Sequence, residues 1–434
     1  MFRCVRAMGA MAVVCSAMMT ADAPAGVETI VIAQSKVAAQ PMKVFIGILG
    51  KASDTAEGRA WIAQLQHCCQ WSGRFELTVQ HLSEIPRKKS DIQKLFQHAY
   101  DCALFVTYNG ARDPVEWRLY DTAMGQMLDG KKLANSAGFA PPANLLADVV
   151  LRQLTNEPQP FLSKIAYRKR DKRGLSHIII TDFDGSHAKD IVKSKRILVA
   201  PRWNNDPDCP ILLFSEFTPN NVRLMMGDLT GRYTPVLDVD GTTVGVSYAQ
   251  TSDDVVYCRS GEIWHYRYDK KYKKSKHTRV IRESDICASP ILLANGDVIY
   301  CCRGVIKKYD AATGDRRVLI GDGYCVAPAY TPVGNKIAYA KRVKKQMEIF
   351  VYDPHTNKHE QVTFGSNDAK SKDYGANKTD PCWAPDGIHL AFCWERRGTS
   401  RIGLLNTLTH VHHFITAEQD YCSYPAWSVN LTIG

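Results

Sequence analysis

The chain has 434 residues, of which 45% are hydrophobic and 23% are charged, and its formal net charge is +11. This composition is typical of a folded protein and gives no reason to expect disorder throughout the chain. The length is sufficient for two or three domains of about 150 residues each. The positive charge favours anionic surroundings such as nucleic acid, lipid headgroups or an acidic partner.

Residues 1–25 are predicted to be a signal peptide that is cleaved on export. Arg3 and Arg6 precede an apolar run at 7–19, and small residues at 21–25 offer cleavage sites. The apolar run has about 13 residues, fewer than the roughly 20 that a membrane-spanning helix needs. We therefore expect an exported protein that does not span a membrane.

Residues 26–40 are expected to form an extended N-terminal arm, and residues 41–157 a small α/β domain. In this domain buried strands alternate with amphipathic helices. The strands are predicted at 44–48, 75–79, 103–108 and 117–120, and the helices at 57–70, 90–99 and 141–154. Prolines and polar residues at 155–160 mark its boundary.

The region at 160–430 contains many short strands and no convincing helix. Its clearest repeat is a proline, one further residue, an aromatic residue and a turn. This repeat is complete at 381–387, weaker around Trp203, Tyr248, Tyr330 and Trp427, and worn at 289–291, where no aromatic residue remains. A second repeat is a strand that ends in a polar turn, at Asp182, Asp228, Asp269, Asp310, Asp353 and Asn406. A period of about 40–45 residues with four short strands is typical of a β-propeller, and six turns predict six blades.

The two ends of this region predict how the propeller closes. The last strand, at 424–427, has no hairpin partner after it, and the first unit has no such strand before it. Pairing of the segment around Trp427 with the segment near Ala166 would complete one blade and leave no open sheet edge. The predicted fold is a small N-terminal α/β domain followed by an all-β six-bladed propeller closed by the C-terminal strand.

No motif supports catalysis. The segments at 180–186 and 236–242 imitate the aspartate motif of phosphatases, but they lie among strands, where Asp-x-Asp-Gly is ordinary turn sequence. The segment at 245–249 resembles a nucleophile elbow, which requires a strand-to-helix turn. We expect no catalytic residue, no bound metal and no cofactor.

Basic residues and cysteines leave alternatives open. The basic clusters at 168–173, 270–276 and 341–345 fall on predicted hairpin tips, which favours solvated loops, with contact to an anionic envelope surface as the alternative. Nucleic-acid binding is not expected, because export removes that ligand. Twelve of the fourteen cysteines lie beyond the signal peptide, where disulfides are permitted. Bridged pairs and buried free thiols both remain open.

Three segments carry a resemblance to a known family. They are 381–387 with 390–392, then 163–167 with 182–185, and finally 424–428. With the signal, the small domain and the repeats in this order, the sequence resembles the TolB family of periplasmic propellers of the Tol–Pal system. The third and fourth units are eroded relative to the family pattern.

The resemblance implies a non-enzymatic periplasmic scaffold. Its propeller face would bind the peptidoglycan-associated lipoprotein Pal, and its arm and small domain would bind inner-membrane Tol proteins. It would maintain outer-membrane integrity and support outer-membrane invagination during cell division. Other outer-membrane or peptidoglycan-linked proteins are alternative partners. An exported propeller hydrolase and a polysaccharide-binding propeller, with Trp264 and Tyr266 stacking on sugars, are alternative functions.

The same resemblance suggests partner-binding residues in two places. In the arm they are Val27, Glu28, Thr29, Ile30, Val31 and Ile32. In the loops before the proline-aromatic strands they are Thr242, Thr243, Ala288, Ser289, Tyr324, Thr379 and Asp380. For the loop residues an ordinary loop without a binding role is the alternative.

Overall fold

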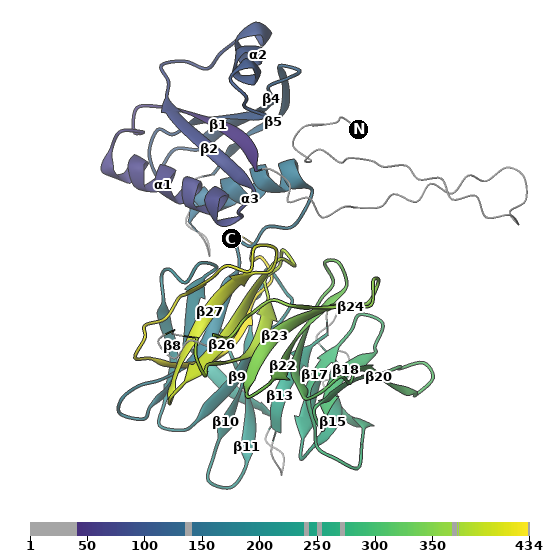
Figure 1. Cartoon of the computed structure of the whole chain (residues 1–434). Helices are drawn as coiled ribbons and strands as arrows, with labels where there is room; N and C mark the ends of the chain where they lie inside the picture. Colours follow the sequence, from purple (N-terminus) through teal and green to yellow (C-terminus); the bar gives the residue numbers. More distant parts are fainter. Residues whose placement is uncertain are drawn as a thin grey trace, which may run out of the picture. The chain divides into compact units, whose positions relative to one another are not determined.

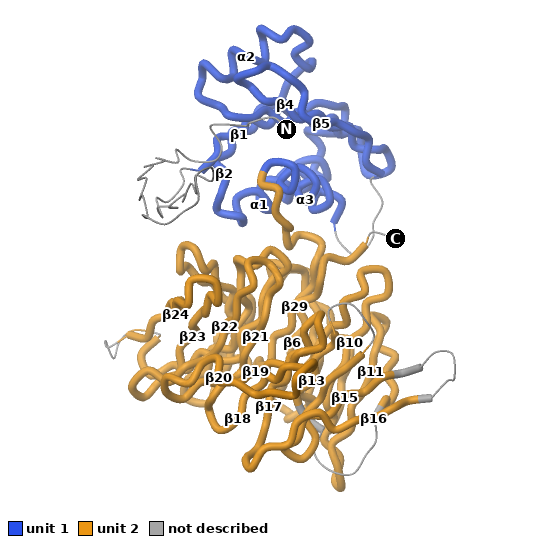
Figure 2. Tube along the Cα trace, turned by 90° about the vertical axis from the view of Figure 1, so that its right-hand side faces the viewer, with its two compact units in different colours: residues 1–137, 141–154 blue, residues 138–140, 155–434 orange. Residues whose placement is uncertain are grey.

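A computed structural model describes residues 41–134, 141–237, 243–249, 254–269, 274–366, 371 and 373–432. These residues form mostly strands, with only three helices. They divide into two compact units, of which unit 1 holds the described residues up to Leu154 and unit 2 those from Thr155 onward (Figure 2). The arm residues 27–32 and Thr242 lie outside the described residues.

Unit 1 contains one mixed sheet and all three helices. The sheet has the strand order β2-β1-β3-β4-β5, with β1 (Met42–Leu49), β2 (Phe75–His81), β3 (Cys102–Thr107), β4 (Val115–Asp121) and β5 (Gln126–Leu133). The first three strands are parallel, and β4 and β5 are antiparallel additions. The helices are α1 (Ala56–Trp71), α2 (Lys89–Gln97) and α3 (Pro142–Thr155). Within this unit, α1 and α3 lie on one side of the sheet and α2 on the other (Figures 1 and 2).

Local sequence explains these elements. The hydroxyl of Thr55 accepts a hydrogen bond from the backbone N–H of Gly58 at 3.0 Å, which caps the start of α1. Trp61, Leu65 and Cys68 recur at helical spacing on one face of α1, and all three are buried. The predicted helices and strands of this region are confirmed within a few residues, but β5 was not expected because its residues show no apolar alternation.

In unit 2, every regular element among the described residues is a strand. Sixteen strands form four separate antiparallel sheets of four, each in chain order, as in propeller blades (Figure 1). The first sheet contains β9 (Leu198–Trp203), β10 (Leu212–Phe217), β11 (Val222–Gly227) and β12 (Tyr233–Leu237), and the second β13 (Thr243–Tyr248), β14 (Val255–Arg259), β15 (Glu262–Asp269) and β16 (Lys274–Ile281). The third contains β17 (Cys287–Leu292), β18 (Val298–Cys302), β19 (Val305–Tyr309) and β20 (Arg316–Ile320), and the fourth β21 (Cys325–Thr331), β22 (Lys336–Val343), β23 (Gln346–Asp353) and β24 (Lys358–Gln361).

The remaining strands join the two ends of unit 2 in one sheet of eight. One half contains β25 (Asn377–Trp383), β26 (His389–Arg396), β27 (Thr399–Asn406) and β28 (His412–Phe414). The other contains β29 (Tyr421–Trp427), β6 (Lys164–Arg170), β7 (Ser176–Asp182) and β8 (Lys189–Ser194). In the described part of the chain, a single strand-pairing residue pair, Ser400 with Tyr421, connects the halves. In the second half Trp427 pairs with Ile165 and Ala426 with Ala166, which confirms the predicted pairing of the C-terminal strand (Figure 2).

The proline-aromatic strands share one backbone irregularity. They are β9, β13, β17, β21, β25 and β29, called first strands below, and each contacts the next in this order and back to β9. Each contains one residue with a left-handed φ, namely Ala200, Gly245, Ser289, Ala327, Asp380 and Tyr424, with φ between 49° and 73°. The pairing of each first strand with its neighbour shifts register there. Proline follows the left-handed residue in all but β13, and since it has no N–H to donate, a bulge costs the ladder no hydrogen bond at that position.

Candidate functional site

The predicted loop residues that the structure describes lie at the beginnings of first strands. Thr243 begins β13, Ala288 and Ser289 are the second and third residues of β17, Tyr324 directly precedes β21, and Thr379 and Asp380 lie in β25. Because neighbouring strands are antiparallel, the turns between the second and third strands lie at this same end of each sheet. The structure therefore assigns these residues to one end of the sheets, in neighbouring first strands.

A set of exposed apolar side chains occupies one equivalent position at this end. The position three places before the left-handed residue of a first strand is occupied by Ile197, Ile286, Tyr324 and Tyr421, called entry residues below. Their exposed fractions are 52%, 76%, 46% and 42%. Single exposed apolar residues are ordinary on protein surfaces. Four at the same register position of a repeated fold form a pattern, and such surfaces are typical of binding sites. Of these four residues only Tyr324 was predicted from the sequence, because the shared position becomes visible only once the left-handed residues are aligned.

Two of the entry residues, Tyr324 and Ile286, lie over glycines of neighbouring turns. A Cβ atom added to Gly304 would lie 2.5 Å from the ring of Tyr324, and one added to Gly261 would lie 3.3 Å from Ile286. The guanidinium of Arg342 lies 4.6 Å from the centre of the Tyr324 ring, within cation–π range. Contacts with the backbone of Gly304 and with the guanidinium of Arg342 thus hold the Tyr324 ring in place, while nearly half of the surface of Tyr324 stays exposed to solvent.

Asp380 is the charged member of the predicted loop residues. Burial raises the pKa of its carboxyl, and the nearby Arg202 partly offsets this effect. The hydroxyl of Thr379 donates to its Oδ2 at 3.3 Å. Burial, and secondly the charge of Asp380, also raise the pKa of Tyr424 in the neighbouring β29. The charge of Asp380 in β25 thus acts on the left-handed residue of the neighbouring β29.

The segments that imitate catalytic motifs have structural contacts. Asp182, at the end of β7, forms an ion pair with Lys164 and lies 2.8 Å from Nδ1 of His187. Another antiparallel strand, β8, follows it. Ser247 lies within β13, and its hydroxyl donates to the carbonyl of Tyr248 at 3.3 Å. The fully described motifs thus lack the strand-to-helix setting that their chemistry requires.

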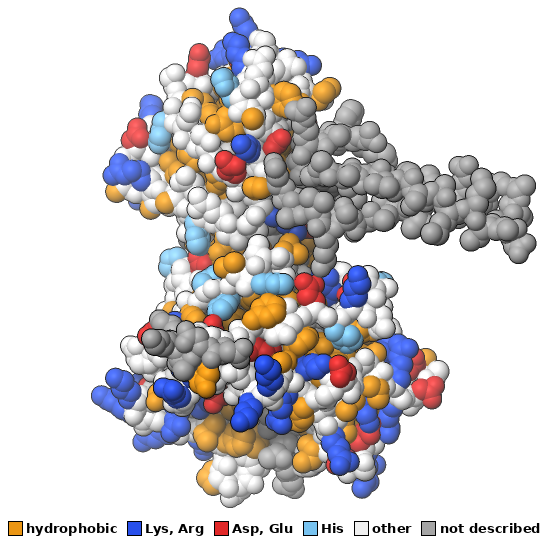
Figure 3. Space-filling model, viewed as in Figure 1, with side chains coloured by type: hydrophobic (Ala, Val, Ile, Leu, Met, Phe, Trp, Pro, Cys, Tyr) orange, Lys and Arg blue, Asp and Glu red, His pale blue; other side chains and the backbone are white. Residues whose placement is uncertain are grey.

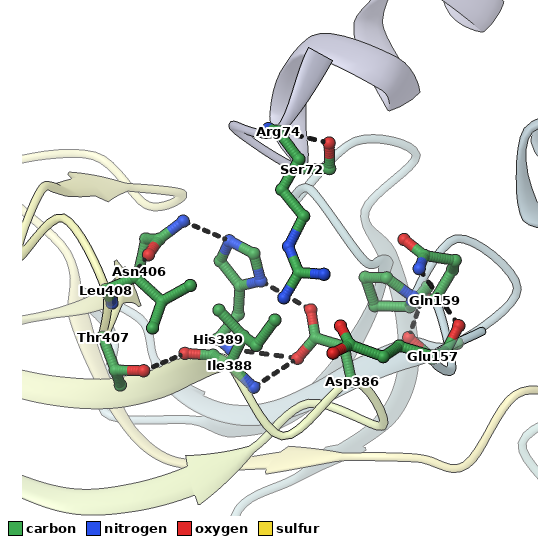
Figure 4. A network of polar contacts seen from close by, with 12 residues as sticks. Ser72, Arg74, Glu157, Gln159, Asp386, Ile388, His389, Asn406, Thr407 and Leu408 are labelled. Atoms are coloured by element: carbon green, nitrogen blue, oxygen red, sulfur yellow. Dashed lines mark hydrogen bonds and ion pairs between the residues drawn. The ribbon is translucent and has the colours of Figure 1, made fainter. Parts of the chain in front are cut away.

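A buried Asp–His pair stabilises the turn at 381–387. Asp386 accepts hydrogen bonds from the backbone N–H groups of Ile388 and His389, both at 2.9 Å. Its other oxygen lies 2.6 Å from Nδ1 of His389, while Asn406 donates to Nε2 at 3.1 Å (Figure 4). Nε2 therefore accepts, and the ring proton lies on Nδ1 and points to the carboxylate. Since both ring nitrogens are engaged, this pair closes the turn between β25 and β26 rather than activating a nucleophile.

The predicted basic clusters lie on hairpin tips where the structure describes them. The cluster at 168–173 spans the end of β6 and the turn to β7, and that at 341–345 spans the turn between β22 and β23. Residues 270–273 of the third cluster lie outside the described residues. On the face of unit 2 seen in Figure 3, Lys and Arg side chains are interspersed with Asp and Glu.

Trp264 and Tyr266, the residues considered for sugar stacking, are only partly exposed and pack against a buried cluster. Tyr266 also lies against the ring of His277, with centroids 5.1 Å apart. In the described part of the chain, no group of three or more His, Cys, Asp or Glu residues could hold a metal ion. No helix in that part is long and apolar enough to cross a bilayer.

No family model matches the chain. Among curated proteins it is 30% identical over 131 residues to the Tol-Pal system protein TolB of Roseobacter denitrificans, covering 29% of each chain. It is 27% identical over 182 residues to TolB of Nitrosococcus oceani, covering 39% of this chain and 42% of the relative. It thus spans less than half the length of these curated relatives.

The structural similarity is more extensive. The crystal structure of TolB from Acinetobacter baumannii superposes with a TM-score of 0.70 and 20% sequence identity, covering 89% of this chain and 96% of that one. At this identity the similarity establishes the fold alone. In local sequence and in overall β-propeller fold, the chain resembles TolB of the Tol–Pal system.

Proposed function

We propose that this chain is the TolB-type scaffold of a Tol–Pal envelope complex. In this proposal it is a non-enzymatic periplasmic protein, exported by a cleaved signal at 1–25, that binds the lipoprotein Pal. The entry residues Ile197, Ile286, Tyr324 and Tyr421 are the observation that carries the proposal, because they present apolar surface at one end of the sheets. The resemblance to TolB in sequence and fold indicates which partner this surface suits.

The proposal includes a six-bladed propeller at 160–430. We interpret the sheet of eight strands as two blades, β25–β28 and β29 with β6–β8, since one residue pair connects its halves. The six left-handed residues and the contacts between consecutive first strands support a closed ring of six. The arm at 26–40, with residues 27–32, and the small α/β domain at 41–157 would engage inner-membrane Tol proteins.

The chemistry of the entry residues fits a protein partner. Tyrosine and arginine are enriched at the energetic centres of interfaces, and Tyr324 with Arg342 supplies both at one point. Thr379 and Asp380 in β25 add polar groups near the same end of the sheets. Pal bound there would link the outer membrane and peptidoglycan to the inner-membrane proteins. This linkage is how the scaffold would maintain outer-membrane integrity and support invagination at division.

The test is a binding measurement between the purified chain and the Pal homologue of the same genome. The double variant Ile286→Ser/Tyr324→Ala should raise the dissociation constant by at least about tenfold, because it removes the central apolar contacts. Leu408→Ser is the matched control, since Leu408 is 62% exposed but lies in the turn after β27, at the opposite end of the sheets. The proposal is wrong if the unmodified chain does not bind Pal, or if the control variant weakens binding as much as the double variant.

A further inference from the structure

Three cysteines occupy equivalent positions in first strands. Cys287, Cys325 and Cys422 each stand two residues before the left-handed residue and are completely buried. The backbone carbonyl of each accepts a hydrogen bond from a cysteine thiol on the second strand of the preceding four strands. Cys258 donates to Cys287 at 2.8 Å, Cys301 to Cys325 at 3.4 Å, and Cys393 to Cys422 at 3.6 Å. In these three pairs the donating sulfur is directed at a backbone oxygen.

Cys287 differs from the other two because a second cysteine faces it. Its register partner in β18 is Cys302, whereas Cys325 faces Lys341 and Cys422 faces Lys169. The exposed fractions of Cys287 and Cys302 are 0% and 4%. Both thiols lie 3.9 Å from the same oxygen, the carbonyl of Asp285. The two sulfurs thus share one small buried space.

The backbone at this pair suits a disulfide. The backbone N–H of Cys287 donates to the carbonyl of Gly261 at 2.8 Å. Cys287 and Cys302 therefore do not exchange backbone hydrogen bonds with each other. Cys287 and Cys302 therefore form a non-hydrogen-bonded antiparallel pair, for which the Cα separation is about 4.5 Å. Disulfides span Cα separations of about 4.4–6.8 Å.

We propose that Cys287 and Cys302 form a cross-strand disulfide when the chain folds in an oxidising compartment. The two thiols lose their protons, one sulfur–sulfur bond forms, and the two electrons pass to a disulfide donor, which leaves as a dithiol. In the cell the donor would be an exported thiol–disulfide oxidoreductase, so this route rests on the proposed export. In vitro, oxidised glutathione supplies the same chemistry without that assumption.

The timing of the step follows from burial. Burial, and secondly the neighbouring Cys302, raise the pKa of the Cys287 thiol. Because the thiolate is the species that attacks a disulfide, the native reduced pair reacts slowly. The bond must therefore form before β17 and β18 are covered, and once formed it is shielded from reductants.

The test is oxidative refolding of the full chain from denaturant and reductant with a glutathione redox pair. After refolding, free thiols are labelled with N-ethylmaleimide under denaturing conditions and the chain is digested. Trypsin cuts at Arg282 and Arg303 and releases one peptide with Cys287, Cys301 and Cys302. We expect this peptide to carry one label, and further cleavage before Asp297 to give two peptides joined through sulfur.

Matched variants assign the bond and control for folding. Cys301→Ser, adjacent in sequence but directed at the carbonyl of Cys325, should leave the link intact, whereas Cys302→Ser should make Cys287 reactive. Cys325 and Cys422 serve as internal controls, which should be labelled in every sample. The oxidised chain should also melt several degrees above the reduced chain, and Cys302→Ser should abolish that difference. Labelling of both Cys287 and Cys302 in the refolded native chain, or a bond from Cys287 to Cys258, would overturn the proposal.

Discussion

Lys378 shows how a single position is adapted within the repeat. It stands two residues before the left-handed Asp380, where three of the other first strands have a cysteine and the remaining two have Leu198 and Thr243. Its side chain is 1% exposed, and its Nζ lies 3.2 Å from Oε1 of Glu348, which is 2% exposed. The hydroxyl of Thr363 donates to the other oxygen of Glu348 at 2.6 Å. A charge at a position that is uncharged in the other first strands is thus balanced inside unit 2.

Removing the cation alone should be costly. Lys378→Met leaves the carboxylate of Glu348 buried without its counter-ion, and we expect the free energy of unfolding to fall by about 3–5 kcal/mol. The double variant Lys378→Met/Glu348→Leu should recover most of this loss, because a buried ion pair gains little over a well-packed apolar pair. Urea unfolding of both variants measures the two values. Equal destabilisation by the single and double variants would contradict this account.

At the scale of the element, the first strand is defined by its left-handed residue. Alanine and other residues with a Cβ atom pay about 1–2 kcal/mol for this conformation, whereas glycine does not. Gly245 is the one glycine among the six, with φ at 73°, and Ala327 occupies the same position in β21, with φ at 50°. A Cβ atom added at Gly245 would meet its nearest neighbour at 3.6 Å, so space is available there.

These two positions give a matched pair of substitutions. Gly245→Ala should lower the free energy of unfolding by about 1 kcal/mol, because the conformational cost exceeds the gain from a stiffer unfolded chain. Ala327→Gly should leave stability unchanged or raise it by up to about 1 kcal/mol, for the reverse reason. Chemical unfolding of the two variants compares them directly. If Gly245→Ala were the more stable of the two, the left-handed residue would not be the constraint that defines these strands.

The sequence predicted the positions of strands and turns better than the register between neighbouring strands. Strand positions followed from apolar alternation, and the turn at Asp386 followed from its proline and glycine. The entry residues Ile197, Ile286 and Tyr421 were missed because their shared position depends on register across strands, which local patterns do not encode. The contact of Cys287 with Cys302 was missed for the same reason. The closing pair, Trp427 with Ile165, was predictable because an unpaired strand at each end leaves few alternatives.

At the scale of the whole molecule, β29 connects the end of the chain to β6. Several contacts secure it: Nε1 of Trp427 donates to the hydroxyl of Ser163 at 2.7 Å, and Nε1 of Trp203 donates to the carbonyl of Ala426 at 3.0 Å. Without β29, strand β6 would present an unpaired edge, which promotes association between chains. The contacts of β29 with β9 and β25 would be lost as well.

Truncation after Asp420 should therefore destabilise all of unit 2, not only its end. We expect the shortened chain to show no cooperative unfolding transition near the melting temperature of the full chain. We also expect it to aggregate at a lower temperature than the full chain does. Deletion of residues 433–434 alone is the control and should change neither property. Calorimetry and light scattering provide the two readouts. A truncated chain that stays monomeric and melts like the full chain would show that β29 is dispensable.

The pairing of β29 with β6 also constrains the order of events during biosynthesis. Ala166 and Ala426 are direct neighbours in the sheet although 260 positions of chain separate them. Contacts between such distant segments form slowly, because the intervening loop must be ordered first. In the proposed export the final strand is the last to cross the membrane, so this sheet would stay incomplete until translocation ends. A chaperone that shields β6 during that interval would limit association between incomplete chains.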